Sequence, residues 1–107
     1  MPKRRYEILI PARLNDGRSV LIQETGSLQQ TLLEVIERFG AMSYNPNTVL
    51  GVYMKDQQRF EDDLYQLTVD VEDTPENRAF FLEFKKKLGE RFQQLEIYMV
   101  TYPVEVL

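Results

Sequence analysis

Carboxylates are the side chains of this 107-residue sequence with the most obvious capacity for chemistry. The candidate metal ligands among them are Asp62, Asp63, Asp70 and Glu72. Mg²⁺ needs only one or two carboxylates besides substrate oxygens, so this group could serve a nuclease-like, divalent-metal-dependent enzyme. Acidic residues also favour helix N-termini and protect the edges of sheets. The sequence favours this second, simpler interpretation of the group.

A further carboxylate, Asp16, lies in the segment Asn15-Asp16-Gly17, directly after the first apolar run. Analogy with small nucleases that place an Asp near this point would make it catalytic, but fold analogy alone does not establish function. Asn, Asp and Gly in succession are typical of a tight turn. We therefore interpret the segment as a turn and assign no catalytic residue.

Two residue types that carry much of enzyme chemistry do not occur in the sequence. It contains no cysteine and no histidine. Disulfides, thiolate catalysis, zinc sites with N/S ligands, histidine-ligated haem and Ser-His-Asp triads are therefore excluded within one chain. We expect no cofactor, and we favour a binding protein over an enzyme.

The charge balance argues against nucleic acid as a partner. The net charge is −4, whereas non-specific nucleic-acid binding needs a basic stripe. The basic residues 3–5 are not followed by the apolar core and small-residue cleavage site of a signal peptide. Because no apolar run approaches the ~20 residues of a membrane span, we expect a cytoplasmic protein without membrane contact.

The last apolar segment suggests a contact surface. Tyr98, Val100 and Tyr102 alternate with Ile97 and Met99, so a strand here is apolar on both faces. Strands of that kind are normally buried on both sides. We predict a homodimer formed through the sheet face that carries these tyrosines and Val100. A small-ligand pocket at the dimer seam is an alternative. Base stacking is disfavoured, because the third predicted strand is acidic and carries no run of aromatic residues.

Periodicity predicts six regular elements. Helical spacing indicates helices over 27–39 and 75–92. Strand patterns cover 6–11, 49–55, 60–72 and 95–106. The order β-α-β-β-α-β is that of a ferredoxin-like α+β fold, in which two helices cover one face of a four-stranded antiparallel sheet. We expect residues 1–107 to form a single domain, with 19–25 as a loop in preference to a strand.

Local signals fix the expected starts of both helices. Ser27 with Gln30 has the spacing of a capping box. Thr74 followed by Pro75 predicts an N-cap and a first helical residue. The predicted core is Ile8, Leu32, Ile36, Phe39, Leu67, Val69, Phe80, Phe84, Leu88 and Ile97.

Several short segments, spread over nearly the whole chain, resemble a group of small uncharacterised bacterial proteins of about this length. They are N-D-G at 15–17, E-R-F-G at 37–40, G-x-Y at 51–53, F-E-D-D at 60–63, V-D-V-E-D-T-P-E-N at 69–77 and R-F-Q-Q at 91–94. The resemblance implies a ferredoxin-like fold. It implies no activity and no catalytic residues.

Overall fold

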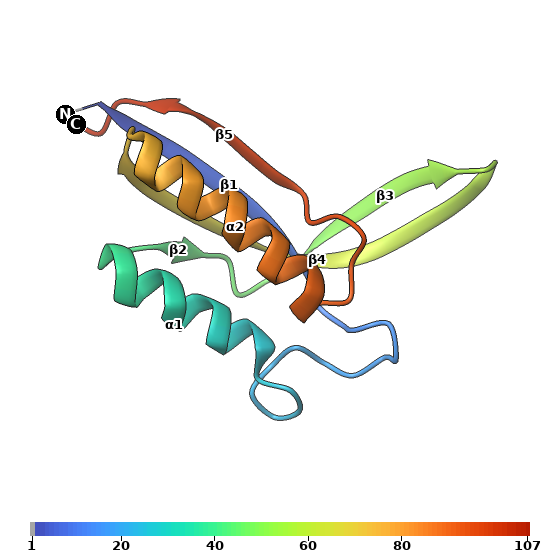
Figure 1. The fold of residues 1–107 in the computed structure, drawn as a ribbon. Coiled ribbons are helices and arrows are strands. Elements are labelled where there is room, and N and C mark those ends of the chain that lie inside the picture. Colours follow the sequence, from blue (N-terminus) through green and yellow to red (C-terminus); the bar gives the residue numbers. More distant parts are fainter. Residues whose placement is uncertain (1) are drawn as a thin grey trace.

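The structure is a computed structural model that describes residues 2–107 (Figure 1). Its elements are β1 (Lys3–Pro11), α1 (Ser27–Phe39), β2 (Ser43–Tyr44), β3 (Val49–Lys55), β4 (Gln58–Glu72), α2 (Pro75–Arg91) and β5 (Met99–Val104). The predicted α+β fold is confirmed, with the two-residue β2 as an added strand. Among the described residues no helix is long and apolar enough to span a membrane.

All strand pairs of the sheet are antiparallel. β1 lies in the centre, between β4 and β5. The opposite edge of β4 carries β2 along one part of its length and β3 along another. β3 and β4 form an antiparallel hairpin, joined by the turn at Asp56 and Gln57. The sheet is thus ferredoxin-like in order, with one strand, β4, that is much longer than its neighbours.

Both helices cover the same face of the sheet, as predicted (Figure 1). Alternate residues of β1 and β4 point toward them and are buried, which the pairing of Ile8 with Leu67 illustrates. The ring of Phe81 in α2 stacks on Tyr6 of β1, with centroids 3.9 Å apart. Fully burying such side chains contributes about 1.5–3 kcal/mol each, so this layer dominates the stability of the fold.

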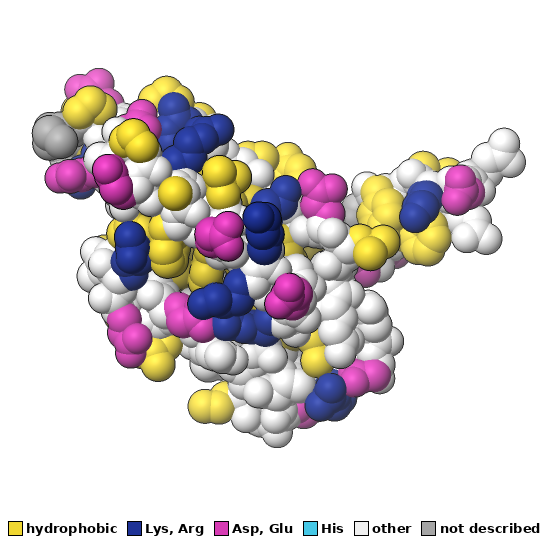
Figure 2. All heavy atoms as spheres, in the orientation of Figure 1, with side chains coloured by type: hydrophobic (Ala, Val, Ile, Leu, Met, Phe, Trp, Pro, Cys, Tyr) yellow, Lys and Arg dark blue, Asp and Glu magenta, His cyan; other side chains and the backbone are white. Residues whose placement is uncertain are grey.

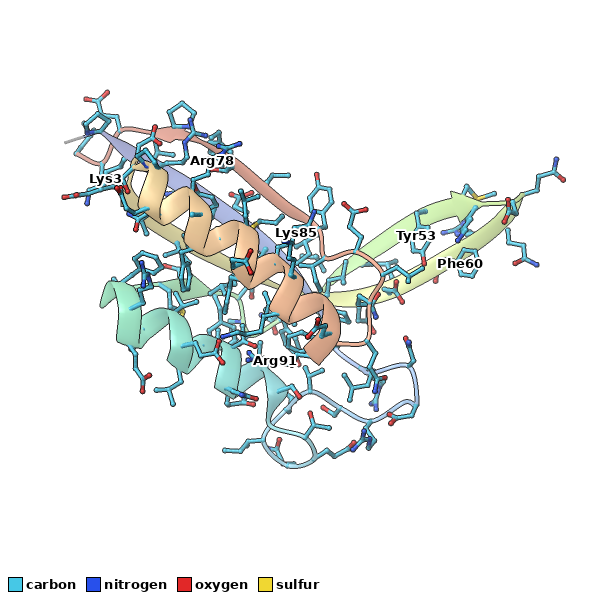
Figure 3. The ribbon with its side chains drawn as sticks, viewed as in Figure 1. Lys3, Tyr53, Phe60, Arg78, Lys85 and Arg91 are labelled. Atoms are coloured by element: carbon cyan, nitrogen blue, oxygen red, sulfur yellow. The ribbon has the colours of Figure 1, made fainter. Side chains whose placement is uncertain are left out.

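The two helices are also joined by a polar clamp. Arg91, near the end of α2, donates hydrogen bonds to Thr31 and Glu34 of α1. Figure 3 shows Arg91 directed between the two helices. The Arg91 side chain is only 12% exposed, so its charge depends on the Glu34 carboxylate for compensation.

The helix starts differ in how far the sequence predicted them. Thr74 caps α2 and accepts a hydrogen bond from the backbone N–H of Asn77, as expected. The capping box at Ser27 was wrong, because α1 is preceded by Gly26 in the left-handed region and has no side-chain cap. Ser27 is already the first helical residue, and Thr25 accepts a hydrogen bond from its N–H.

Three further segments refine the predicted organisation. Residues 19–25 form a turn-rich loop, as predicted, and the buried Val20 anchors it. The short strand β2 was not predicted, because residues 41–48 carry loop signals. The last strand begins at Met99, not at 95, since Leu95 lies fully in solvent.

The core is close to the predicted set but extends further. Of the predicted residues, Ile8, Leu67, Val69, Phe84, Leu88 and Ile97 are buried, and Leu32, Phe39 and Phe80 are partly buried. Ile36 was wrongly placed in the core and is 38% exposed. The prediction omitted Phe81 and Phe92, which are among the largest fully buried side chains.

Candidate functional site

A long hairpin arm leaves the body of the molecule. The arm, residues 49–63, consists of β3 and the first part of β4, and Figure 1 shows it projecting beyond the helices. Its two strands pair from Val49–Leu64 to Lys55–Gln58. At the tip, Asp56 and Gln57 both have positive φ angles, 51° and 65°. Two successive residues of this kind match the right-handed twist of a tight hairpin.

The arm carries an unusual amount of exposed apolar surface. Its exposed apolar side chains are Val49, Leu50, Val52, Tyr53, Met54 and Phe60. Met54 is 65% exposed, Leu50 59% and Tyr53 50%. Figure 2 shows apolar side chains gathered on the arm, and Figure 3 shows Tyr53 and Phe60 on it. These two rings stack, with centroids 5.2 Å apart.

The apolar side chains lie on both faces of the arm. Tyr53 and Phe60 are directly paired and therefore share a face, and Met54 points to the opposite face. Apolar residues on both faces are typical of a strand that is covered on both sides. Contiguous apolar patches on a soluble protein mark contact surfaces. The arm therefore has the character of an interface strand.

The sheet face opposite the helices is polar toward the start of β1. Arg5 forms a two-pronged ion pair with Asp70 across the strands, at 2.8 and 2.9 Å. These hydrogen bonds lower the pKa of the Asp70 carboxyl and raise that of Arg5. Tyr102 donates a hydrogen bond to the Glu7 carboxylate, which raises the pKa of the Tyr102 hydroxyl. This part of the face satisfies its own polar groups.

The same face becomes apolar toward the arm. Leu9 on β1, Leu64 on β4 and Tyr98, just before β5, occupy it, and Tyr98 is 62% exposed. Of the three predicted interface residues, Tyr98 therefore lies on the apolar part. Val100 pairs with Glu7 and Tyr102 pairs with Arg5, so both lie among the polar groups. All three share the uncovered face, as their alternation indicates.

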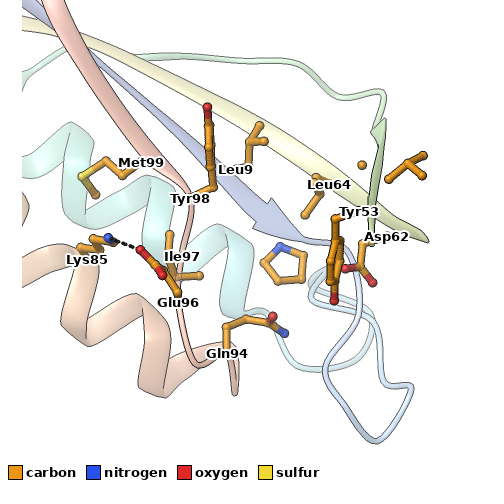
Figure 4. Close-up of a pocket in the computed structure, with 13 residues that line it drawn as sticks. Leu9, Tyr53, Asp62, Leu64, Lys85, Gln94, Glu96, Ile97, Tyr98 and Met99 are labelled. Carbon is orange, nitrogen blue, oxygen red and sulfur yellow. Dashed lines mark hydrogen bonds and ion pairs between the residues drawn. The ribbon is translucent and has the colours of Figure 1, made fainter. Parts of the chain in front are cut away.

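A groove of about 590 Å³ lies where the arm leaves the sheet (Figure 4). Its lining comes from the arm, the end of β1, the segment before β5, and α2. The lining residues are Leu9, Pro11, Gly51, Val52, Tyr53, Asp62, Leu64, Lys85, Gln94, Glu96, Ile97, Tyr98 and Met99. Lys85 and Glu96 form an ion pair at 3.1 Å on one side. The lining suits recognition of a small molecule, with apolar walls and a few polar groups.

The predicted acidic group does not converge on one point. Asp62 and Asp63 lie in the arm and are exposed, whereas Asp70 and Glu72 lie at the other end of β4. Asp62 and Asp70 are separated by roughly 27 Å of extended strand. Asp70 is engaged by Arg5. Within residues 2–107 no group of three or more acidic side chains could hold a metal ion.

Asp16 lies in the turn predicted for it and serves that turn. Its carboxylate accepts hydrogen bonds from the backbone N–H and the side chain of Arg18. These bonds lower the pKa of Asp16. The residue is exposed, and it lies outside the groove.

Sequence reasoning missed the arm and the groove, although a signal for the arm was present. Residues 49–54 read V-L-G-V-Y-M, which is apolar on both faces. The same pattern in the last strand was used to predict an interface. Residues 49–55 were instead assigned to the sheet as an ordinary strand, because periodicity does not show which part of a sheet extends beyond the helices that cover it.

Comparison with known proteins finds likeness in structure and not in sequence. No protein-family profile matches the chain, and no curated protein matches it in sequence. Among solved structures, CutA1 from Oryza sativa superposes with a TM-score of 0.67 at 8% identity, covering 99% of this chain and 83% of that one. The divalent cation tolerance protein CutA1 from Thermus thermophilus gives 0.65 at 13%, covering 97% and 85%.

A phage SAM lyase in complex with S-methyl-5'-thioadenosine is similarly close. Its TM-score is 0.65 at 14% identity, and the match covers 97% of this chain and 90% of the lyase. These three structures are described in different terms, and each is less than 15% identical to this chain. They establish that the chain has the fold of the CutA1 structures, a small ferredoxin-like α+β fold.

Proposed function

We propose that this chain is a small binding or assembly protein whose copies associate through the arm and the adjoining apolar part of the sheet face. The carrying observation is the arm itself, a two-stranded hairpin with exposed apolar side chains on both faces. Hairpins without a third strand or a covering helix are marginally stable in water. A second copy of the chain would supply that cover.

The composition of the surface supports self-association. Tyr and Met are enriched in the cores of protein interfaces, and charged residues are depleted there. Tyr53, Met54 and Tyr98 are each at least half exposed in one chain. A homodimer is the simplest closed assembly that uses one surface twice. A stable interface of the usual size buries roughly 800 Å² per partner.

Sedimentation velocity of Met54→Glu tests the proposal. Met54 lies on the arm face turned away from the groove, and its cross-strand partner is Arg59. A carboxylate at 54 would meet this guanidinium, so the arm can still form in the single chain. In an interface the same carboxylate would lose its hydration, so we expect the dissociation constant to rise at least about a hundredfold.

Ile22→Glu is the matched control. Ile22 is 69% exposed and lies in the loop before α1, away from the arm. The Ile22→Glu substitution should leave the sedimentation coefficient unchanged at micromolar concentration. Tyr98→Glu should weaken association if the sheet face takes part as well. A monomeric parent chain at these concentrations would contradict the proposal.

A further inference from the structure

The groove beside the arm presents one uncompensated carboxylate to an apolar, aromatic space. Lys85 and Glu96 neutralise each other across their ion pair. Asp62 lines the groove and forms no ion pair with any Lys or Arg within residues 2–107. The charged groups that line the groove therefore sum to one negative charge. This field attracts a small cation and repels an anion.

The surroundings of Asp62 select the kind of cation. Tyr53 shares its face of the arm and lies diagonally across the strand pair, a spacing within reach of an aromatic ring. Directly opposite Asp62 stands Gly51, and the Leu64 side chain lies over this glycine, where a Cβ would come within 2.7 Å of it. Figure 4 shows Tyr53 and Asp62 together at one end of the groove, with Leu64 beside them.

An aromatic face next to a carboxylate is a favourable site for an organic cation. The ring attracts the positive charge through its quadrupole, and weakly hydrated quaternary ammonium groups use such sites best. The remaining wall, formed by Leu9, Pro11 and Leu64, is apolar and suits a hydrocarbon or aryl body. A metal ion held by protein side chains alone fits less well, because no group of three ligating side chains converges at Asp62. The neighbouring carboxylates of Glu61 and Asp63 point to the opposite face of the arm.

From these contacts we infer that the groove binds a small organic monocation with an apolar body, the charge lying against Asp62 and Tyr53. The groove volume of about 590 Å³ is within the usual range for small-molecule sites. One chain supplies every lining residue, so the site goes beyond self-association. Because Leu9, Leu64 and Tyr98 also belong to the surface proposed for self-association, ligand binding and assembly are measured separately.

The test is titration of the full chain by calorimetry and NMR with three aryl probes that differ in charge. They are benzyltrimethylammonium, neutral benzyl alcohol and anionic benzoate. We expect saturable binding of the ammonium probe, at least about tenfold tighter than that of the alcohol, and no binding of benzoate. Chemical shifts should move at residues 51–53, 62–64 and 96–98.

Neighbouring residues provide a matched pair of variants. Asp62→Asn should weaken binding of the ammonium probe about tenfold. Asp63→Asn removes the same charge one position along, on the opposite face of the arm and outside the groove, and should leave binding within about twofold. Tyr53→Leu should weaken binding of the ammonium probe more than binding of the alcohol. Unchanged sedimentation of the Asp62 variant separates this effect from assembly.

Three results would overturn the inference. The first is the absence of saturable binding at millimolar probe, as expected if a cationic side chain of a second copy already fills the groove. The second is an equal loss of affinity in the Asp62 and Asp63 variants, which would reflect overall charge alone. The third is binding of the alcohol as tightly as the ammonium probe.

Discussion

The two parts of β4 show how one strand behaves in two environments. In its second part, from Leu64 onward, burial alternates residue by residue, because helices cover one face. There β1 pairs along one edge and the short β2 pairs with part of the other. In its first part, residues 58–63, every side chain is exposed, and β3 is the only strand that pairs with it. The backbone is extended throughout. The difference is what covers it.

This contrast separates what holds the body together from what the arm requires. The body part of β4 lies in a closed core and has Asp70 paired with Arg5 on the open face. The arm part has neither a covering layer nor a second neighbouring strand, yet its partner β3 is apolar on both faces. The body is therefore complete within one chain, and the arm is the region in which a partner or ligand adds most.

The largest effect is expected from breaking the body. Phe81→Ala should lower the free energy of unfolding by about 3–5 kcal/mol, because a buried aromatic side chain is replaced by a cavity. Phe81 is 1% exposed and stacks on Tyr6 as well as on Phe39. Chemical denaturation followed by circular dichroism measures this change.

Leu82→Ala is the control for this substitution. Leu82 is the next residue of α2 and is 56% exposed, so its truncation should change stability by less than about 0.5 kcal/mol. A loss below about 1 kcal/mol for Phe81→Ala would show that the closed core is less dominant than the contrast between the two parts of β4 implies.

The elements that could be predicted from sequence are those set by local interactions. Periodicity gave both helices, and Thr74 gave the start of α2, because a cap and an apolar stripe are encoded within a few residues. The start of α1 was less well predicted, since a left-handed glycine at 26 replaces a side-chain cap. Strand β2 makes only two residue pairs, both with β4, which is distant in sequence. No local sequence signal predicts it.

The candidate site was predicted less well, because its surfaces depend on register. Alternation placed Tyr98 and Tyr102 on one face, and they do share it. Only pairing with β1 shows that Tyr102 lies beside Arg5 and donates to Glu7, whereas Tyr98 reaches the apolar end. The groove combines β1, the arm, α2 and the segment before β5, a set that no sequence window contains.

A smaller effect is expected at the tip of the arm. Gln57 has a φ angle of 65°, which disfavours a residue with a side chain. Gln57→Gly should stabilise the arm by about 0.5–1 kcal/mol by relieving this conformation, since Asp-Gly suits the turn better. Amide hydrogen exchange in β3 should slow about threefold. The matched control is Gln58→Gly, in the strand proper, which should speed the exchange instead.

The smallest effect on stability is expected from the ion pair between Arg5 and Asp70 on the body part of β4. The dependence of stability on pH measures this contribution. Arg5 lowers the pKa of Asp70 in the folded chain below its value of about 3.9 in the unfolded chain. A depressed carboxyl pKa stabilises the fold fully above pH ~4, and this contribution is lost as pH falls through the folded-state value.

Asp70→Asn should therefore lower the melting temperature at pH 7 by at most about 4 °C, as expected for one partly exposed ion pair. Because the parent chain loses the ion pair as Asp70 becomes protonated, the difference between the two proteins should shrink as pH falls below ~4. Thermal melts of both proteins between pH 7 and pH 2 measure it. Thr68→Ser, two positions away on the same face of β4, changes no charge and should give a difference that does not vary with pH. A gap between parent and Asp70→Asn that stays constant over this range would mean that the pair adds no pH-dependent stability to the body part of the strand.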